Sequence, residues 1–315
     1  MKKLLITRRL PDANLQAARA RYDVTLREET TGLTMAEAAT ALASYDAILL
    51  TLGDQFSAGA FTGDIRCGML ANFGVGYNHI DVDAARAAGV QVSNTPDVVT
   101  DATADIGMTL ILSTCRRAGE GERLVRGGNW SGWSPTQMLG THVTGKTVGI
   151  VGMGRIGQAV ARRCHFGFDM PVLYFNRSQK AVDVPARQVD TLAELMAEAD
   201  VIVVTVPGGG ANTHLIDAQA LAAMKPSGIF VNIARGDVVD EEALIAALQA
   251  GHIAGAGLDV FANEPMVPDA LRVLENAVIL PHLGTAALEV REAMGQMALD
   301  NIIAWDEGRA LPQAV

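Results

Sequence analysis

The chain has 315 residues, and 49% of them are hydrophobic, which is enough apolar sequence for two hydrophobic cores. Its 25 basic and 35 acidic residues leave a net charge of −10, which argues against nucleic acid or an acidic membrane surface as a partner. The three cysteines, Cys67, Cys115 and Cys164, lack the spacing of a disulfide framework or a zinc site, so we expect no metal and a reducing, cytoplasmic location.

The first residues, MKKLLITRRL, contain an apolar run of only four residues before Arg8 and Arg9. Such a run is too short for the core of a signal peptide or for a membrane span. We therefore expect a soluble protein that does not bind a membrane.

Short apolar runs alternate with Ala-rich amphipathic segments over the first hundred residues. Runs that are apolar on both faces predict strands of a parallel sheet covered by helices on both sides. A helix is predicted over about 100–119, followed by a loop rich in Gly, Trp and Pro, GGNWSGWSPTQMLGTHVTG. The predicted strands of this part are 4–7, 24–26, 47–52, 69–73 and 90–93.

A second series of strands predicts a second sheet. Six strands complete a doubly wound sheet, and the helical pattern over 286–307 has no strand after it, so we expect that helix to pack on the first domain. The fold prediction is therefore an α/β protein of two Rossmann-like doubly wound parallel-sheet domains, with the active-site cleft between them. The flavodoxin-like substrate-binding domain is predicted at 1–98 plus 286–315, and the dinucleotide-binding domain at 99–285. The strands of the second series are 147–151, 172–175, 201–205, 229–232, 255–259 and 278–280.

A glycine-rich turn, Gly152-x-Gly154-x-x-Gly157, stands directly after a predicted strand and before a predicted amphipathic helix. In such a turn the first glycine permits the tight bend, the second lets the backbone approach a pyrophosphate, and the third allows close packing of the helix. The helix N-terminus adds unpaired amides and a partial positive charge. This context favours a dinucleotide site over an ordinary glycine-rich turn.

The next strand ends with Asn176, Arg177 and Ser178, where NAD-binding units usually carry an acidic residue. Asn176 removes the negative charge that would repel a 2′-phosphate, and Arg177 and Ser178 offer donors for one. We therefore predict NADP in preference to NAD. The alternative is a solvated turn with a surface arginine.

Three polar residues, Arg235, Glu264 and His282, follow predicted strands of the second sheet. Hydride transfer to a 2-oxo acid needs a guanidinium for the carboxylate, an imidazolium to deliver a proton, and a carboxylate that favours the protonated imidazole. We predict these three roles in that order. Each residue also has a structural alternative: His282 as a hydrogen-bonding residue, Arg235 in a turn, and Glu264 as a solvated loop acid.

The segments VGMGRIG, NIARGDVVDEEAL, GLDVFANEP and PHLGTA, in this order, resemble the D-isomer-specific 2-hydroxyacid dehydrogenases over nearly the whole chain. The resemblance implies that Arg235, Glu264 and His282 are catalytic. One departure is the glycine-rich segment 206–213, where relatives usually show a bulkier turn beside the cofactor. The resemblance also implies substrate contacts at Leu52, Gly53, Val75 and Gly76, with the amides of Val75 and Gly76 holding the substrate carboxylate. It implies cofactor contacts at Thr103, Arg155, Ile156, Pro207, Thr213, Ile233, Ala234, Asp259 and Gly284.

Within the family, the chain looks like the glyoxylate and hydroxypyruvate reductase branch. Asn176 in place of an acid is one reason, and the loop with Trp130 and Trp133 is another, because it is similar to a loop that reaches the partner subunit's active site. This similarity predicts a homodimer and a substrate contact at Trp133, with plain dimer packing as the alternative.

The resulting function prediction is NADPH-linked reduction of a small 2-oxo acid to the D-2-hydroxy acid. The alternatives are NAD-dependent oxidation of another D-2-hydroxy acid, or a non-catalytic dinucleotide sensor, because a fold alone does not determine function.

Overall fold

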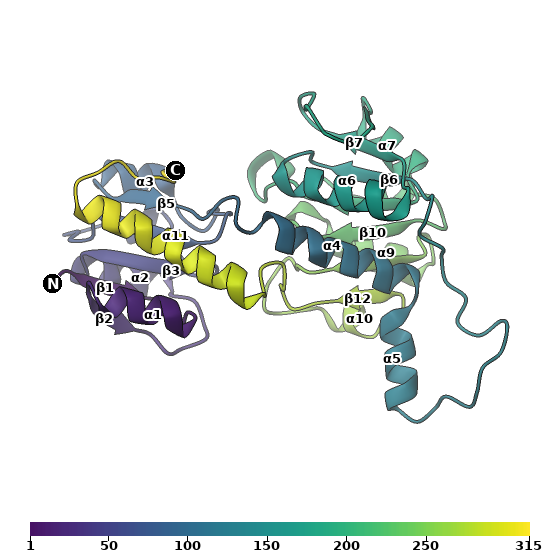
Figure 1. The fold of residues 1–315 in the computed structure, drawn as a ribbon, viewed down its shortest axis with the longest axis horizontal. Coiled ribbons are helices and arrows are strands. Elements are labelled where there is room, and N and C mark those ends of the chain that lie inside the picture. Colours follow the sequence, from purple (N-terminus) through teal and green to yellow (C-terminus); the bar gives the residue numbers. More distant parts are fainter. The chain divides into compact units, whose positions relative to one another are not determined.

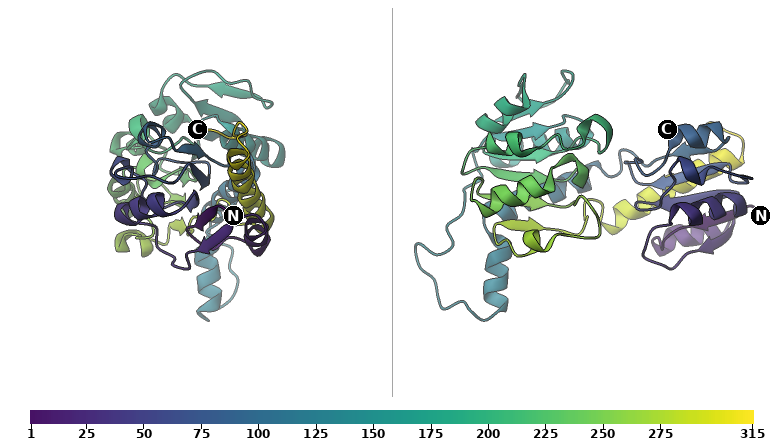
Figure 2. Two further views of the ribbon diagram at one scale, coloured as in Figure 1. Left: turned by 90° about the vertical axis from the view of Figure 1, so that its left-hand side faces the viewer. Right: turned by 180° about the vertical axis from the view of Figure 1, so that it is seen from behind.

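The computed structural model describes residues 1–315, which divide into two compact units (Figures 1 and 2). Unit 1 comprises Met1–Val99 and Thr285–Val315, and unit 2 comprises Thr100–Gly284. Each unit contains one parallel sheet with helices on both of its faces. The predicted α/β class with two parallel-sheet domains is therefore confirmed.

The sheet of unit 1 has five parallel strands in the order β2-β1-β3-β4-β5. All five residues of β3, AILLT, are buried, which explains why this strand appears in the sequence as a continuous apolar run. The order reverses direction between β1 and β3, and ligands of open α/β sheets bind outside the carboxyl ends of strands at such a point. The strands are β1 (Lys3–Ile6), β2 (Asp23–Leu26), β3 (Ala47–Thr51), β4 (Met69–Phe73) and β5 (Gln91–Ser93).

Helices from the two ends of the chain cover the same face of this sheet. Leu15 of α1 and Ala298 and Leu299 of α11 share one hydrophobic cluster with β1, β3 and β4, so the helix predicted over 286–307 does pack on the first sheet. The opposite face is covered by α2, α3 and the short η1. The helices are α1 (Asp12–Arg19), α2 (Met35–Ser44), η1 (Ala58–Ala60), α3 (Val82–Ala87) and α11 (Leu288–Asp306).

The sheet of unit 2 has seven parallel strands in the order β12-β11-β10-β9-β6-β7-β8. The prediction of six strands is wrong by one, because it missed β8 (Ala186–Gln188). This edge strand has only three residues, and none of them is buried, so its sequence lacks an apolar run. The other strands are β6 (Val148–Val151), β7 (Val172–Phe175), β9 (Val201–Val204), β10 (Ile229–Asn232), β11 (Gly255–Leu258) and β12 (Ala277–Ile279).

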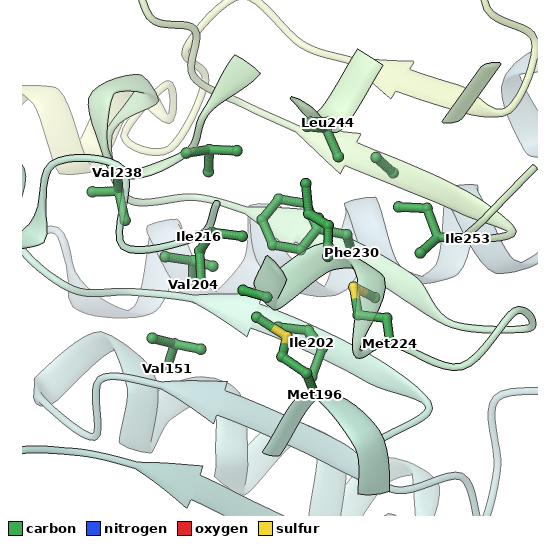
Figure 3. Packing of buried hydrophobic residues seen from close by; sticks show 14 of the residues in the cluster. Val151, Met196, Ile202, Val204, Ile216, Met224, Phe230, Val238, Leu244 and Ile253 are labelled. Atoms are coloured by element: carbon green, nitrogen blue, oxygen red, sulfur yellow. The ribbon is translucent and has the colours of Figure 1, made fainter. Parts of the chain in front are cut away.

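Two hydrophobic clusters fix this sheet from its two faces. One contains α4 and α6, and the other contains α7, α8 and α9. In the second cluster Phe230 is fully buried and lies near Met196, Ile202 and Met224 (Figure 3). Burial of a side chain of this size stabilises the fold by about 1.5 to 3 kcal/mol, and the closely packed strands hold the loops at their carboxyl ends in place.

The helix predicted over 100–119 is two helices, which is a correction. The helix α4 ends at Cys115, and Arg117 adopts a left-handed conformation with φ 52°, which interrupts the helical path before α5. None of the helices of the chain combines the length and the apolar character needed to cross a membrane. The helices of unit 2 are α4 (Thr100–Cys115), α5 (Ala118–Arg126), α6 (Arg155–Phe168), α7 (Leu192–Glu198), η2 (Gly210–Asn212), α8 (Ala218–Ala222), η3 (Gly236–Val238), α9 (Glu241–Gln249) and α10 (Asp269–Arg272).

Candidate active site

The glycine turn follows β6 and leads into α6, at the point where the strand order of unit 2 reverses between β6 and β9. Gly152 has φ +98°, which favours glycine, and a Cβ atom at Gly157 would lie 2.2 Å from the carbonyl oxygen of Gly152. A Cβ atom at Gly154 would meet nothing within 4 Å. The three positions therefore have the tight bend, the close helix packing and the open approach that a pyrophosphate needs.

The first turn of α6 contains Arg155 and Ile156, and no side chain caps this helix. The N-cap residue is Gly154, which has no side chain to place over the helix N-terminus, and such an N-terminus suits the binding of an anion. No group of His, Cys, Asp and Glu residues in the chain has an arrangement that could hold a metal ion.

The strand end after β7 carries Asn176, Arg177 and Ser178. The side chain of Asn176 is engaged within the protein, because its Oδ1 accepts from the Met153 amide at 3.2 Å and its Nδ2 donates to the Ser178 carbonyl at 2.7 Å. Asn176 thus ties this strand end to the glycine turn. Arg177 is exposed, so its guanidinium is accessible to a ligand.

The glycine-rich segment after β9 lies against Arg235. The amide of Gly209 donates to Asp237 Oδ2 at 2.6 Å, and a Cβ atom at Gly208 would lie 2.7 Å from Arg235 Cγ and from Asp237 Oδ1. Only glycine fits at position 208 without displacing these side chains. Pro207 and Thr213, at the two ends of the segment, are exposed.

Three predicted cofactor-contacting residues lie together although they are far apart in the sequence. The carboxylate of Asp259 accepts from the amides of Leu283 and Gly284, at 2.6 and 2.8 Å. A Cβ atom at Gly284 would lie 3.5 Å from the Thr103 side chain. Burial raises the pKa of the Asp259 carboxyl, although the two amides and His282 oppose that effect.

Two further predicted contacts, Ile233 and Ala234, follow β10 and have buried side chains. Each belongs to one of the two hydrophobic clusters, and their exposed fractions are 5% and 7%. Their side chains are therefore part of the packing of unit 2, and only small parts of them are accessible.

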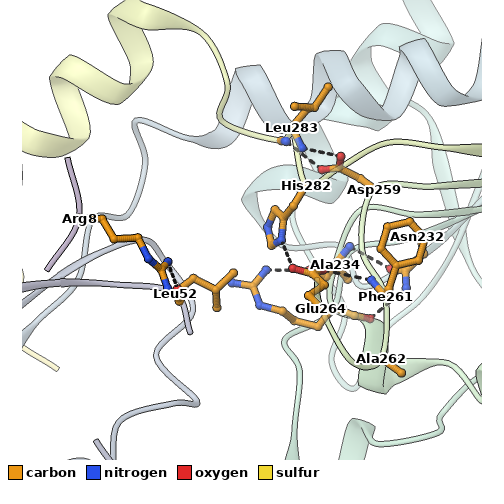
Figure 4. Close-up of polar contacts among 12 residues, drawn as sticks. Arg8, Leu52, Asn232, Ala234, Asp259, Phe261, Ala262, Glu264, His282 and Leu283 are labelled. Carbon is orange, nitrogen blue, oxygen red and sulfur yellow. Dashed lines mark hydrogen bonds and ion pairs between the residues drawn. The ribbon is translucent and has the colours of Figure 1, made fainter. Parts of the chain in front are cut away.

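His282 is held in an uncommon backbone conformation after β12, with φ 53°. Its amide donates to the carbonyl oxygens of Asp259 and Leu280, at 2.9 and 3.1 Å. Its ring Nδ1 lies 2.8 Å from Glu264 Oε2 (Figure 4). Because Nδ1 is occupied by the carboxylate, Nε2 is the ring nitrogen left for a ligand.

Glu264 is fixed from two sides. Its Oε2 contacts His282, and its Oε1 accepts from the Phe261 amide at 3.1 Å. Burial acts to raise the pKa of Glu264, but the hydrogen bond with His282, the charge of His282, the Phe261 amide and the charge of Arg235 outweigh it and lower the pKa below its ordinary value. Glu264 is therefore a carboxylate over a wide range of pH.

Arg235 presents hydrogen-bond donors that the protein does not use. Its Nη1 donates to the Ala234 carbonyl at 2.7 Å, but its Nε is buried without a hydrogen-bond partner. Burial lowers the pKa of Arg235, while the negative charges of Glu264 and Asp237 oppose that effect. A guanidinium nevertheless stays charged at physiological pH. A buried unpaired Nε next to an Nη group is suited to a bidentate carboxylate.

The turn that carries Arg235 depends on Asn232, which the sequence analysis did not select as a site residue. Asn232 is 1% exposed, its Nδ2 donates to the Arg235 carbonyl at 2.9 Å, and its Oδ1 accepts from the Ala234 amide at 3.0 Å. The sequence signal that could have identified Asn232 is its position as a polar residue at the end of an apolar strand. The structure thus brings Arg235, Glu264 and His282 together in unit 2.

The predicted substrate contacts of unit 1 follow β3 and β4. Leu52 and Gly53 are exposed, and Arg8 donates to the Leu52 carbonyl. Asp54 is fully buried and accepts from Thr7, Leu33 and Thr51.

The residues Val75 and Gly76 lie in the turn after β4, and Val75 is 37% exposed. Trp133 belongs to unit 2 and is 79% exposed.

Comparison with known proteins identifies this arrangement. The family "D-isomer specific 2-hydroxyacid dehydrogenase, NAD binding domain" matches residues 108–284. A glyoxylate reductase of Thermococcus onnurineus is 41% identical over 99% of this chain and 95% of its own length. The chain belongs to the D-isomer-specific 2-hydroxyacid dehydrogenases.

Two further relatives place the chain within these dehydrogenases. A glycerate dehydrogenase of Hyphomicrobium methylovorum is 37% identical over 100% of this chain and 99% of its own length. The crystal structure of an NADPH-dependent glyoxylate/hydroxypyruvate reductase from Sinorhizobium meliloti, in complex with citrate, superposes with a TM-score of 0.88 at 33% identity, over 100% and 98% of the two chains. The predicted resemblance to this branch of the D-2-hydroxyacid dehydrogenases is confirmed, and the chain is a dinucleotide-dependent oxidoreductase.

Proposed function

We propose that this enzyme reduces a small 2-oxo acid of the glyoxylate or hydroxypyruvate type to the D-2-hydroxy acid, with NADPH as the reductant. The observation that carries the proposal is the contact of 2.8 Å between His282 Nδ1 and Glu264 Oε2, close to a guanidinium with an unpaired buried Nε. A proton donor and a carboxylate-binding group are the two things that this reduction requires of the protein. The names of the relatives support the same substrate class.

The features of unit 2 fit a dinucleotide, and several segments are candidates to hold it. Gly152, Gly154 and Gly157 would accept the pyrophosphate, together with the first turn of α6. Arg177 and Ser178 would accept a 2′-phosphate, because Arg177 is an exposed cation and no acidic residue stands at this strand end. Further contacts are proposed at Thr103, Arg155, Ile156, Asn176, Pro207, Thr213, Ile233, Ala234, Asp259 and Gly284.

The bound cofactor supplies a hydride for C2 of the substrate. Arg235 binds the substrate carboxylate through Nε and an Nη group and thereby orients the C2 carbonyl. His282 Nε2 donates a proton to the carbonyl oxygen, which becomes the hydroxyl group of the product, and His282 regains a proton from solvent. Glu264 keeps the imidazole ring oriented through Nδ1. Leu52, Gly53, Val75 and Gly76 are proposed to contact the substrate from unit 1.

One alternative is NAD-dependent oxidation of another D-2-hydroxy acid, since a relative is named a glycerate dehydrogenase. Asn176 in place of an acid disfavours NAD at this strand end. The other alternative is a non-catalytic dinucleotide sensor. The hydrogen-bonded His282–Glu264 pair disfavours it, because a sensor would need no oriented proton donor.

A steady-state screen of 2-oxo acids with NADPH and with NADH tests the proposal, with the loss of reduced-nicotinamide absorbance as the readout. We expect turnover of glyoxylate or hydroxypyruvate and a higher kcat/KM with NADPH. Turnover with NADH alone would favour the first alternative, and binding of the cofactor without any turnover would favour the sensor.

The proposed quaternary structure is a homodimer. The helix α5 has no buried residue, and Val125, Trp130, Trp133 and Leu139 are 53% to 79% exposed on α5 and the loop after it. Exposed apolar side chains at this density are typical of a protein interface. A substrate contact of Trp133 in the partner subunit is part of the proposal. Light scattering of the wild type and of Trp130→Ser gives the test, with a dimer expected only for the wild type.

A further inference from the structure

The turn after β4, residues Gly74–Tyr77, has an unusual distribution of hydrogen bonds. Its first three carbonyl oxygens all accept hydrogen bonds from the body of unit 1. Asn72 Nδ2 donates to the carbonyls of Gly74 and Gly76, at 2.9 and 3.0 Å, and Asn94 Nδ2 donates to the carbonyl of Val75 at 2.9 Å. The Thr95 amide also donates to Gly74, at 3.0 Å.

The amides of the same peptide groups are left without acceptors. The N–H groups of Val75, Gly76 and Tyr77 donate to no carbonyl or side chain of the protein. In a trans peptide the N–H group points away from the preceding C=O group. Because each of the three carbonyls is held on the protein side, the three amides point away from it. Successive amides with a common direction form a concave site for an anion.

Two asparagines impose this arrangement from neighbouring strands. Asn72 belongs to β4 and is 1% exposed, and Asn94 follows β5, which pairs with β4. Both side chains use their amide nitrogen on the turn, and the Oδ1 atom of Asn72 is buried without a hydrogen-bond partner. The side-chain amide of Asn72 is thus used for the turn, although burying its Oδ1 without a hydrogen bond costs free energy.

We infer that Asn72 and Asn94 are positioning residues for the substrate: they hold the Gly74–Tyr77 turn so that its amides bind the carboxylate of the 2-oxo acid. This inference rests on the proposed function, in which Val75 and Gly76 contact the substrate. Neither asparagine touches the substrate. Their neutral amide groups donate to the carbonyls and add no negative charge beside the anion.

The substitutions Asn72→Asp and Asn94→Asp test the inference because they keep the shape of the side chain. Each exchanges a donor for a carboxylate that repels the turn carbonyls, so the amides lose their common direction. Asn14→Asp is the matched control. Asn14 is also buried in unit 1 and donates to a backbone carbonyl, that of Glu292 at 2.9 Å, but it lies outside the turn.

We expect both turn variants to raise the KM for the 2-oxo acid at least about 10-fold, or about 1.4 kcal/mol, with kcat and the KM for NADPH nearly unchanged. Asn14→Asp should lower the melting temperature as much as Asn72→Asp does and leave the KM unchanged. Asn94→Gln, which keeps the donor, should recover part of the loss. Equal KM values for Asn72→Asp, Asn94→Asp and Asn14→Asp would overturn the inference.

Binding of oxalate, a carboxylate that is not reduced, separates this inference from the proposed function. Titration calorimetry with oxalate and saturating NADPH should show weaker binding to Asn72→Asp and Asn94→Asp than to the wild type and to Asn14→Asp. If the wild type reduces no 2-oxo acid, the proposed function fails, and the oxalate comparison still decides the role of the asparagines. Equal oxalate affinity in all four proteins would overturn that role.

Discussion

The two parallel sheets of the chain present polar groups at their carboxyl ends in different ways. In unit 2 these groups are charged side chains, Arg235, Glu264 and His282, each supported by backbone contacts. In unit 1 they are backbone amides of the turn after β4, whose carbonyls are held by the buried Asn72 and the partly buried Asn94. Two parallel sheets of the same architecture can therefore present an anion either with charged side chains or with a set of oriented backbone dipoles.

The largest effect is expected where unit 2 supplies the proton. His282→Ala or His282→Asn should lower kcat about 1000-fold, because His282 is the proposed proton donor to the substrate oxygen. The Kd for NADPH, measured by fluorescence titration, should stay nearly unchanged. The control is His252→Asn, an exposed histidine of the same unit. Turnover close to that of the wild type would remove His282 from the role of proton donor.

The positive charge of Arg235 alone should not be enough to bind and orient the 2-oxo acid, because the planar guanidinium also supplies two parallel donors. Arg235→Lys keeps the charge but loses the bidentate donors, so kcat/KM for the 2-oxo acid should fall about 100-fold, with a raised KM. Steady-state kinetics beside Arg272→Lys, an exposed arginine, gives the comparison. Kinetics like those of the wild type would place Arg235 outside the substrate site.

A third prediction concerns Arg177, an exposed charge of unit 2. Arg177→Ala should weaken NADPH binding by roughly 1 to 3 kcal/mol, the scale of a charge-assisted contact, and leave NADH binding little changed. The Kd values of both cofactors measure this directly. Equal losses for the two cofactors would show that the 2′-phosphate does not lie at this strand end.

The smallest effect is expected for Glu264→Gln, which keeps the side-chain shape but removes the charge. The kcat near neutral pH should fall about 10-fold, because the imidazole is less firmly oriented. The variant Glu242→Gln, at an exposed position of α9, should have normal kinetics.

Glu264→Gln should also change how the stability of the fold depends on pH. The pKa of Glu264 is lower in the folded protein than its ordinary 4.5, so its carboxylate stabilises the fold above that pH, and the contribution is lost as the pH falls through the lower folded value. The melting temperatures of the wild type and Glu264→Gln should therefore differ at neutral pH and converge in acid. A difference that is constant with pH would contradict this origin.

The contrast between the two units also explains what the sequence could and could not predict. Arg235, Glu264 and His282 follow apolar runs that predict parallel strands. Because the carboxyl ends of parallel strands lie at the same edge of a sheet, the three side chains were predicted to lie there together. The amides of the turn after β4 were selected only through the family resemblance, because an N–H group is common to nearly all residues and gives no signal in the sequence pattern itself. Asn72 and Asn94 appear as ordinary polar residues in the sequence until their hydrogen-bond partners are known.

Individual strands and helices also show which features of the fold could be predicted from the sequence. The strands β4, β7 and β10 were predicted with the bounds that the structure has, because each combines a buried apolar run with a clear end. The strand β8 was missed because an edge strand of three residues carries no apolar run. The break between α4 and α5 was missed because the left-handed conformation of Arg117 depends on tertiary context. The internal bonds of Asn176 were likewise invisible in the sequence.

The position of α11 in the chain determines the order in which the two units can fold during synthesis. It covers one face of the sheet of unit 1, yet its residues come after all of unit 2 in the chain. During synthesis the ribosome therefore releases a complete unit 2 while the first sheet still exposes apolar residues such as Leu4 and Leu49. The hydrophobic core of unit 1 is therefore completed only after unit 2 has been synthesised, and until then one apolar face of its sheet is uncovered.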